Sequence, residues 1–160
     1  DISDVEAKID TIRALHESLQ YTEDADTVPL APYLRDVLQN VFSLAAYPVD
    51  ATVDTGNAAF PSHVTVAVGL TVSEIAMNAI KHGFITDERA EFRVELRPEG
   101  NTNTLVVSSS GRPIPHEIDL DAPTTLGLQL IATLIDQLHG SLTIDRAPVP
   151  VFTIRFPTPR

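Results

Sequence analysis

The chain has 160 residues, 43% of them hydrophobic, which is enough to bury the core of one compact domain. Twenty-two acidic residues against 11 basic ones give a formal net charge of -11, which disfavours binding to nucleic acid phosphates and to anionic membranes. The absence of cysteine excludes disulfides and thiolate metal sites. No apolar run suggests a membrane span, which needs roughly 20 residues, and no signal peptide pattern is evident, so we expect this fragment to contact no membrane.

Apolar residues recur in steps of three and four over the first twenty positions. The series consists of Ile2, Val5, Ile9, Ile12 and Leu19. This spacing is a heptad seam, which is typical of a helix that packs against a partner helix. His16 completes the series, which favours a packing role for its side chain.

Helices and strands alternate along the rest of the sequence. Pro32 lies near the start of a helix that ends before Pro48, and residues 49–55 alternate like a half-buried strand. The longest helix is predicted over residues 63–82, ended by Gly83. Further strands are expected over 92–96, 104–108, 141–145 and 152–156, with hairpin residues at 98–101 and a helix over 126–139 ended by Gly140. The order predicts an α/β or α+β fold with two layers, in which the helices cover one face of one sheet.

Two segments attract functional interest. Residues 111–125 contain three prolines and little periodicity, and loops of that length in compact domains are usually functional. The helix over 63–82 is apolar around most of its circumference, which predicts burial. One polar stripe interrupts it, made of Thr71, Glu74, Asn78, Lys81 and His82.

The residue types in this stripe suit a metal-bound polyphosphate. The amide oxygen of Asn78 can ligate Mg²⁺, and Lys81 can meet phosphate charge. Glu74 can orient or deprotonate a nucleophile. The same spacing also fits a solvated helix face with an ion pair between Glu74 and Lys81, and the spacing alone leaves both interpretations open.

The segment from Ser73 to Phe84 resembles the N box of sensor histidine kinases, a pattern of Glu, Asn, Ala and Lys on one helix. Gly127, within residues 125–131, resembles the glycine box that opens the helix after the ATP lid, and residues 152–157 resemble the closing strand. Residues 15–21 are similar to the second hairpin helix of the histidine-kinase type 2 group. The resemblance covers essentially the whole chain. It implies the Bergerat, or GHKL, fold, an α/β sandwich with a mixed sheet, preceded by a helix of a dimerisation hairpin.

By this resemblance, residues 1–22 are part of the hairpin and residues 28–160 form the ATP-binding catalytic domain. The implied function is that of a two-component sensor histidine kinase in the cytoplasm. It binds ATP and Mg²⁺ and transfers the γ-phosphate to a histidine outside this fragment. A response regulator is the implied next acceptor, and the hairpin is the implied homodimer contact.

The resemblance assigns the nucleotide site to eight residues. They are Glu74, Asn78, Lys81, His82, Ser109, Gly111, Gly127 and Leu128. Glu74 would be the catalytic carboxylate and Asn78 the Mg²⁺ ligand. Lys81 would contact phosphate, and His82 would lie beside the nucleotide.

The sequence departs from the family at the adenine-binding box, Asp-x-Gly-x-Gly. Ser109 replaces the aspartate that accepts from the adenine amino group, and Pro113 replaces the second glycine. A neutral hydrogen bond is weaker than a charge-assisted one, so the serine loses about 1 to 2 kcal/mol, or about tenfold in affinity. The step from Gly111 to Pro113 resembles that of the HWE group, but that group's tryptophan and glutamate would fall on Val107 and Ser109.

Three functions therefore compete. The first is a working histidine kinase domain, whose acceptor histidine lies outside the chain because the type 2 pattern His-Arg-x-Lys-Asn does not occur in it. The second is a nucleotide-deficient, pseudokinase-like module for dimerisation or regulator docking. The third is an anti-sigma-type serine kinase, which the heptad helix at the start disfavours. We interpret His16 as structural, and His63, His116 and His139 as capping or solvated residues without metal-ligand spacing.

Overall fold

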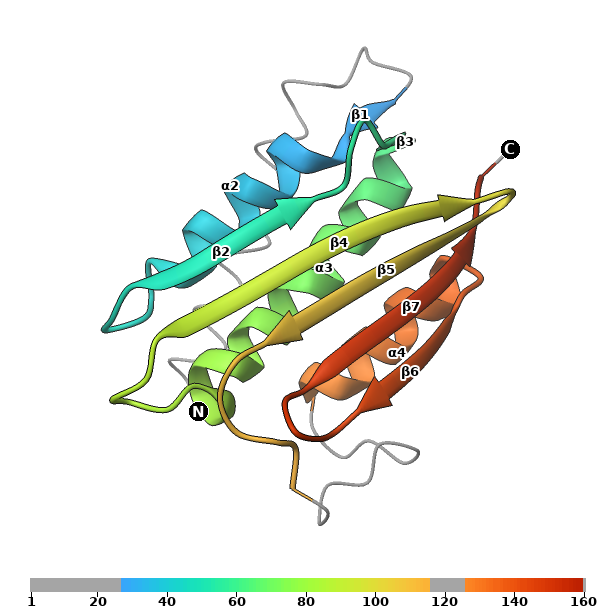
Figure 1. The fold of residues 1–160 in the computed structure, drawn as a ribbon. Coiled ribbons are helices and arrows are strands. Elements are labelled where there is room, and N and C mark those ends of the chain that lie inside the picture. The colour runs from blue at the N-terminus through green and yellow to red at the C-terminus, as the bar shows by residue number, and fades with distance from the viewer. Residues whose placement is uncertain (1–26, 116–125, 160) are drawn as a thin grey trace.

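A five-stranded sheet carries the part of the chain that the computed structural model describes, residues 27–115 and 126–159 (Figure 1). Its strands, in spatial order, are β2 (Val49–Asp54), β4 (Ala90–Glu99), β5 (Thr102–Ser109), β7 (Val151–Pro157) and β6 (Ser141–Asp145). β2 pairs parallel with β4, and the other neighbours pair antiparallel, so the sheet is mixed. Two short strands, β1 (Val28–Pro29) and β3 (Ala59–Phe60), pair with each other in a separate ribbon.

Three α-helices lie against one face of the sheet (Figure 1). They are α2 (Leu30–Phe42), α3 (Ser62–Asn78) and α4 (Leu126–Gln137). α3 packs against both of the other helices and against β5. The expected two-layer α+β fold with helices on one face of a mixed sheet is therefore confirmed.

One-sided burial of the strands explains why the sheet has one covered face. In β4 the side chains of Phe92, Val94 and Leu96 point toward the helices and are buried, while the residues between them are charged. Each such large apolar side chain stabilises the fold by about 1.5 to 3 kcal/mol on burial. On the opposite face Arg93 and Glu95 form an ion pair, as expected for a face that stays in water.

The central helix α3 is buried on most of its surface, as its apolar composition predicts. By length and composition alone, Ser62–Gly83 could cross a membrane, but 72% of its apolar 18-residue window is buried inside the domain, so it is a core helix. Its packing against α2 requires a small residue at Gly69, because a Cβ atom there would lie 2.6 Å from the ring of Tyr33. Burial of that ring raises the pKa of the Tyr33 hydroxyl.

The structure corrects several predicted boundaries. β4 and β5 are longer than expected, because Pro98 and Glu99 belong to β4 and the turn contains only Gly100 and Asn101. Gly100 has the positive φ of 63° that such a turn needs. The predicted heptad helix with His16, together with His116, lies outside the described residues.

Gly140 was expected to end α4, and the structure assigns that role to the preceding residue. His139 takes the left-handed conformation at φ 57°, and the Gly140 N–H donates to the carbonyl of Ile135 at 3.0 Å. Gly140 is required for a different reason, because a Cβ atom on it would lie 2.6 Å from the carbonyl oxygen of Arg155. The close approach of Gly140 itself to β7, and not backbone freedom, requires a glycine here.

Candidate functional site

The last turn of the central helix is a π-helix, Ala79–Gly83, which continues α3 directly. Its wider ring is closed by the N–H of Phe84, which donates to the carbonyl of Ala79 at 2.8 Å. π-turns are frequent at functional sites because they change the direction of the side chains that follow. The sequence correctly predicted a helix up to Gly83, but apolar periodicity did not reveal this change of winding.

The four candidate residues of the N-box segment differ in depth. Glu74 is only 4% exposed, and Asn78, one turn later on the same face of α3, is half-buried. Lys81 and His82 follow in the π-turn and are exposed. The helix thus leads from a buried carboxylate to a surface ammonium and imidazole, whose directions are set by the π-turn and not by α-helical spacing.

The strand β5 ends beside this π-turn, and two backbone contacts join them. The N–H of Arg112 donates to the carbonyl of Gly83 at 2.7 Å. Gly111 has a φ of 105°, and a Cβ atom on it would lie 2.2 Å from the same carbonyl oxygen. Only glycine fits this position, so the predicted site residue Gly111 lies directly against the end of the N-box segment. In Figure 1 both ends lie at the same edge of the molecule.

Ser109 is the last residue of β5, and it faces the helices with 6% of its surface exposed. Its N–H donates to the carbonyl of Pro150 at 3.4 Å, which holds the backbone against the segment before β7. Within the described part of the chain its hydroxyl makes no hydrogen bond. The structure therefore places a largely buried serine, whose hydroxyl makes no hydrogen bond to the described residues, at the position where the family resemblance implies contact with the nucleobase.

The next residue, Ser110, has a structural role that the sequence did not indicate. Its hydroxyl accepts from the N–H of Glu91 at 2.9 Å and donates to the carbonyl of Arg89 at 3.2 Å. Its own N–H donates to the carbonyl of Glu91 at 2.9 Å. These bonds clamp the end of β5 to the start of β4, so Ser109 and Gly111 are held from both sides. In the sequence, only the alternation of buried and exposed positions along β5 could have indicated that Ser110 lies on the opposite face from Ser109.

The segment after Gly111 is fixed as far as Pro115. The N–H of Ile114 donates to the carbonyl of Arg146 at 3.0 Å, and the guanidinium of Arg146 donates to the carbonyl of Pro115 at 2.6 Å. Arg146 thus ties the start of the predicted lid to the β6–β7 connection, a contact that sequence analysis missed. The predicted loop residues 116–125 lie outside the described residues. Beyond them, Gly127 is buried and Leu128 is half-buried in the first turn of α4.

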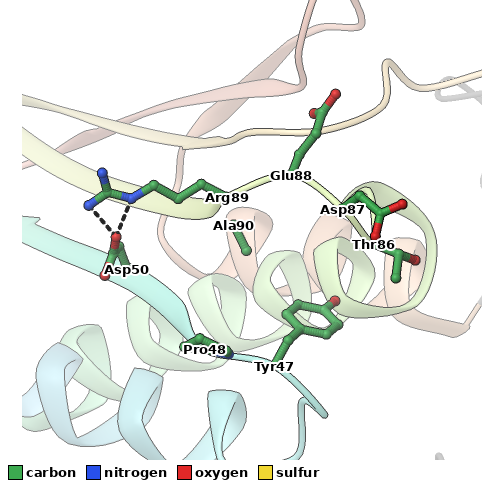
Figure 2. Close-up of a pocket in the computed structure, with 8 residues that line it drawn as sticks. All are labelled: Tyr47, Pro48, Asp50, Thr86, Asp87, Glu88, Arg89 and Ala90. Carbon is green, nitrogen blue, oxygen red and sulfur yellow. Dashed lines mark hydrogen bonds and ion pairs between the residues drawn. The ribbon is translucent and has the colours of Figure 1, made fainter.

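A hollow of about 480 Å³ opens between the starts of β2 and β4 (Figure 2). Its lining consists of Tyr47, Pro48, Asp50, Thr86, Asp87, Glu88, Arg89 and Ala90. Figure 2 shows Arg89 reaching across to Asp50, with the Nε to Oδ2 bond at 2.6 Å. That bond raises the pKa of Arg89 and occupies its guanidinium. The hollow contains none of the eight predicted site residues.

No cluster of three or more His, Asp or Glu side chains suited to a metal ion occurs among residues 27–115 and 126–159. His63 and His139 are exposed at the ends of α3 and α4, which agrees with the expectation that they are solvated. Mg²⁺ commonly binds with one or two protein oxygens and several phosphate oxygens. The half-buried amide of Asn78 suits that mode.

The known proteins that resemble this chain include sensor histidine kinases. The curated relatives include "Blue-light-activated histidine kinase 2" of Erythrobacter litoralis, which is 26% identical over 149 residues. "Sensor histidine kinase PdtaS" of Mycobacterium tuberculosis is 28% identical over 142 residues. The alignments cover 87% and 84% of this chain but only 42% and 28% of those proteins. The chain thus spans less than half the length of either relative.

Among solved structures, a histidine kinase domain from Erythrobacter litoralis EL346 matches with a TM-score of 0.83 at 20% identity, over 96% of this chain and 74% of that one. The mycobacterial sensor histidine kinase MprB matches with a TM-score of 0.63 at 18% identity, over 82% of this chain and 96% of that one. At these identities the matches establish the fold. The family described as "Histidine kinase-like ATPase domain" matches residues 22–147, and the chain therefore belongs to the histidine kinase-like ATPase domain family.

Proposed function

We propose that this chain is the catalytic domain of a cytoplasmic two-component sensor histidine kinase. It binds Mg-ATP and transfers the γ-phosphate to a histidine outside residues 1–160, from which a response regulator takes it. The observation that carries the proposal is the pair of side chains on α3, Glu74 and Asn78. One is a buried carboxylate and the other a half-buried amide one turn away, at the end of the helix that Gly111 contacts.

Each residue of this end has a defined task. The carboxylate of Glu74, held in a largely water-free position, orients the acceptor imidazole and receives its proton. In that step the bond between the imidazole nitrogen and the γ-phosphorus forms, the bond from the γ-phosphorus to the bridging oxygen breaks, and ADP leaves. The amide oxygen of Asn78 holds Mg²⁺ on the phosphate side of the site. Mg²⁺, when bound, neutralises charge on the phosphate oxygens. The exposed ammonium of Lys81 adds positive charge in a chain with a net charge of -11, and His82 lies beside the nucleotide.

The lid side of the site is contributed by backbone. Gly111 allows the chain after β5 to approach the π-turn closely, and Gly127 with Leu128 opens α4. Helix N-termini present unsatisfied N–H groups that favour anions such as phosphate. We place the triphosphate between this helix opening and α3, and the purine at Ser109.

Nucleotide affinity tests the proposal directly. Titration of the purified chain with ATP in the presence of Mg²⁺ should give saturable binding, and Asn78→Ala should weaken it by at least about tenfold, the cost of losing a metal ligand. Asn40→Ala, on the exposed face of α2, is the matched control and should leave the affinity unchanged. No binding at millimolar ATP, with the chain folded, rejects the kinase proposal.

A second function deserves a test because of Ser109 and Pro113. A domain that has lost nucleotide would serve as a dimerisation or regulator-docking module, with the homodimer formed through the helical hairpin to which residues 1–22 are assigned. In that case Ser109→Asp restores the family's carboxylate and should create or strengthen ATP binding by about tenfold. If Ser109→Asp leaves nucleotide binding unaltered, the motive for the docking module disappears.

A further inference from the structure

The hydroxyl of Ser109 is the starting point. The residue is 94% buried, and its side chain faces the helix layer at the end of β5. Its position is fixed by its neighbours on both sides. Ser110 is clamped to β4, and Gly111 lies against Gly83. The hydroxyl itself makes no hydrogen bond within the described part of the chain, so only its torsion determines where its proton points.

A hydroxyl and a carboxylate differ in what they can recognise. An ionised carboxylate only accepts hydrogen bonds, whereas a serine hydroxyl donates one and accepts others. The 6-amino group of adenine is a donor, and the 6-oxo group of guanine and hypoxanthine is an acceptor. A carboxylate at this place binds the first and repels the second. The unengaged hydroxyl of Ser109 can satisfy either group by rotating about one bond.

The neighbours of the hydroxyl along β5 and on β4 are uncharged, which leaves it able to donate or to accept. On its own strand the neighbouring side chains are neutral, Val107 on the same face and Ser108 and Ser110 on the other. Phe92, which pairs with Ser109 from the neighbouring strand β4, is buried and apolar. No described side chain next to Ser109 along the strand or across β4 therefore replaces the missing carboxylate and imposes an acceptor on the base.

We propose that Ser109 gives this site relaxed purine selectivity, so that it binds 6-oxopurine nucleoside triphosphates as well as ATP. The inference rests on the proposed function, because it assumes that the purine end of a nucleotide reaches Ser109. It goes further by naming a wider substrate class and the residue that determines it.

The test compares Mg²⁺-dependent affinities for ATP, ITP and GTP, measured calorimetrically on the full chain. ITP changes the 6-position without the 2-amino group of GTP, so it isolates the recognition step. In the native chain we expect the ATP and ITP dissociation constants to lie within about tenfold of each other, since neither base leaves a buried charge unpaired. Ser109→Asp should strengthen ATP binding by about tenfold and weaken ITP binding by about tenfold. The ratio of the two dissociation constants should therefore change by about 100-fold.

Two further variants control the interpretation. Ser108→Asp adds the same charge one residue away, on the outer face of β5, and should leave the ratio unchanged. Ser109→Ala removes the hydroxyl and should weaken the binding of ATP and of ITP by similar factors. If Ser109→Asp fails to fold, the native ratio and Ser109→Ala together still decide the question.

The outcomes separate this inference from the function on which it rests. A native chain that binds ATP more than about 100-fold tighter than ITP overturns relaxed selectivity, while the kinase proposal stands. Relaxed selectivity is also overturned if Ser109→Asp leaves the ratio of the ATP and ITP dissociation constants unchanged, or if Ser109→Ala leaves both affinities unchanged. If neither nucleotide binds the folded native chain, the proposed function fails and this inference fails with it.

Discussion

The two ends of the proposed nucleotide site are built in different ways. At the phosphate end, Glu74 and Asn78 lie on one continuous element, α3, and share a face because they are four residues apart. The base end is assembled from segments far apart in the sequence. The carbonyl of Gly83 meets Gly111, and the N–H of Glu91 meets Ser110.

The difference has a consequence for substitution. A side chain buried on α3, between two other helices, can be replaced only at the expense of core packing, and Glu74 is such a residue. At the base end the backbone contacts hold the position, and the side chain of Ser109 contributes no hydrogen bond to the described structure. No hydrogen bond of the described structure therefore depends on the side chain of Ser109. Recognition of the base can change while the geometry of the site stays the same.

The largest effect is expected at the phosphate end. Glu74→Gln keeps the shape of the buried side chain but removes its ability to accept a proton. In a longer chain that includes the acceptor histidine, autophosphorylation should slow by about 10² to 10⁴-fold, while Mg-ATP affinity changes by less than about threefold. Glu91→Gln, exposed at the start of β4, is the control. An unaltered phosphorylation rate in Glu74→Gln would remove Glu74 from the mechanism.

Gly111, where the chain after β5 contacts the π-turn, should be the next most sensitive position. Gly111→Ala combines a positive φ with a Cβ atom 2.2 Å from the Gly83 carbonyl, and it should lower the free energy of unfolding by about 3 kcal/mol or more. Denaturant titration measures this loss. Gly100→Ala shares the positive φ but has no atom within 4 Å, so it should lose only about 1 kcal/mol. Equal losses in the two variants would contradict the close contact between β5 and the π-turn.

A pH-dependent effect is expected where α2 packs on α3. Burial raises the pKa of Tyr33 in the folded chain, while in the unfolded chain it titrates near its ordinary value of about 10. The unfolded state therefore loses its proton first, so stability that is present below about pH 10 is lost as the pH rises above it. Relative to Tyr33→Phe, the native chain should lose about 1 kcal/mol of unfolding free energy between pH 7 and pH 11. A difference that stays constant over this range would mean that the hydroxyl reaches water.

The smallest effect concerns the clamp at the base end. Ser110→Ala removes the hydrogen bonds to the backbone of Arg89 and Glu91, which should lower the free energy of unfolding by about 1 kcal/mol. Ser108→Ala, half-buried on the same face of β5, serves as the comparison and should lose less than about 0.5 kcal/mol. Thermal unfolding of both variants measures the difference. If the two lose the same amount, the clamp contributes nothing to the position of Ser109.

By itself, the sequence determined the elements and the chemistry of the phosphate end. Apolar periodicity and turn residues predicted α2, α3, α4 and the strands of the main sheet, but not the short strands β1 and β3, and the fixed geometry of a helix placed Glu74 and Asn78 on one face. These properties depend on neighbours along the chain, so a local pattern can predict them. The resemblance to histidine kinases added the family and its fold, and the comparisons confirmed both.

Tertiary structure decided the depth of each polar side chain and the shape of the base end. The burial of Glu74 and the exposure of Lys81 follow from what packs around α3 and from the π-turn at its end. The φ of 105° at Gly111 matters only because Gly83 lies 28 residues earlier in the sequence and next to it in space. Contacts between distant segments leave no periodic signal in either segment, which is why only the folded chain reveals them.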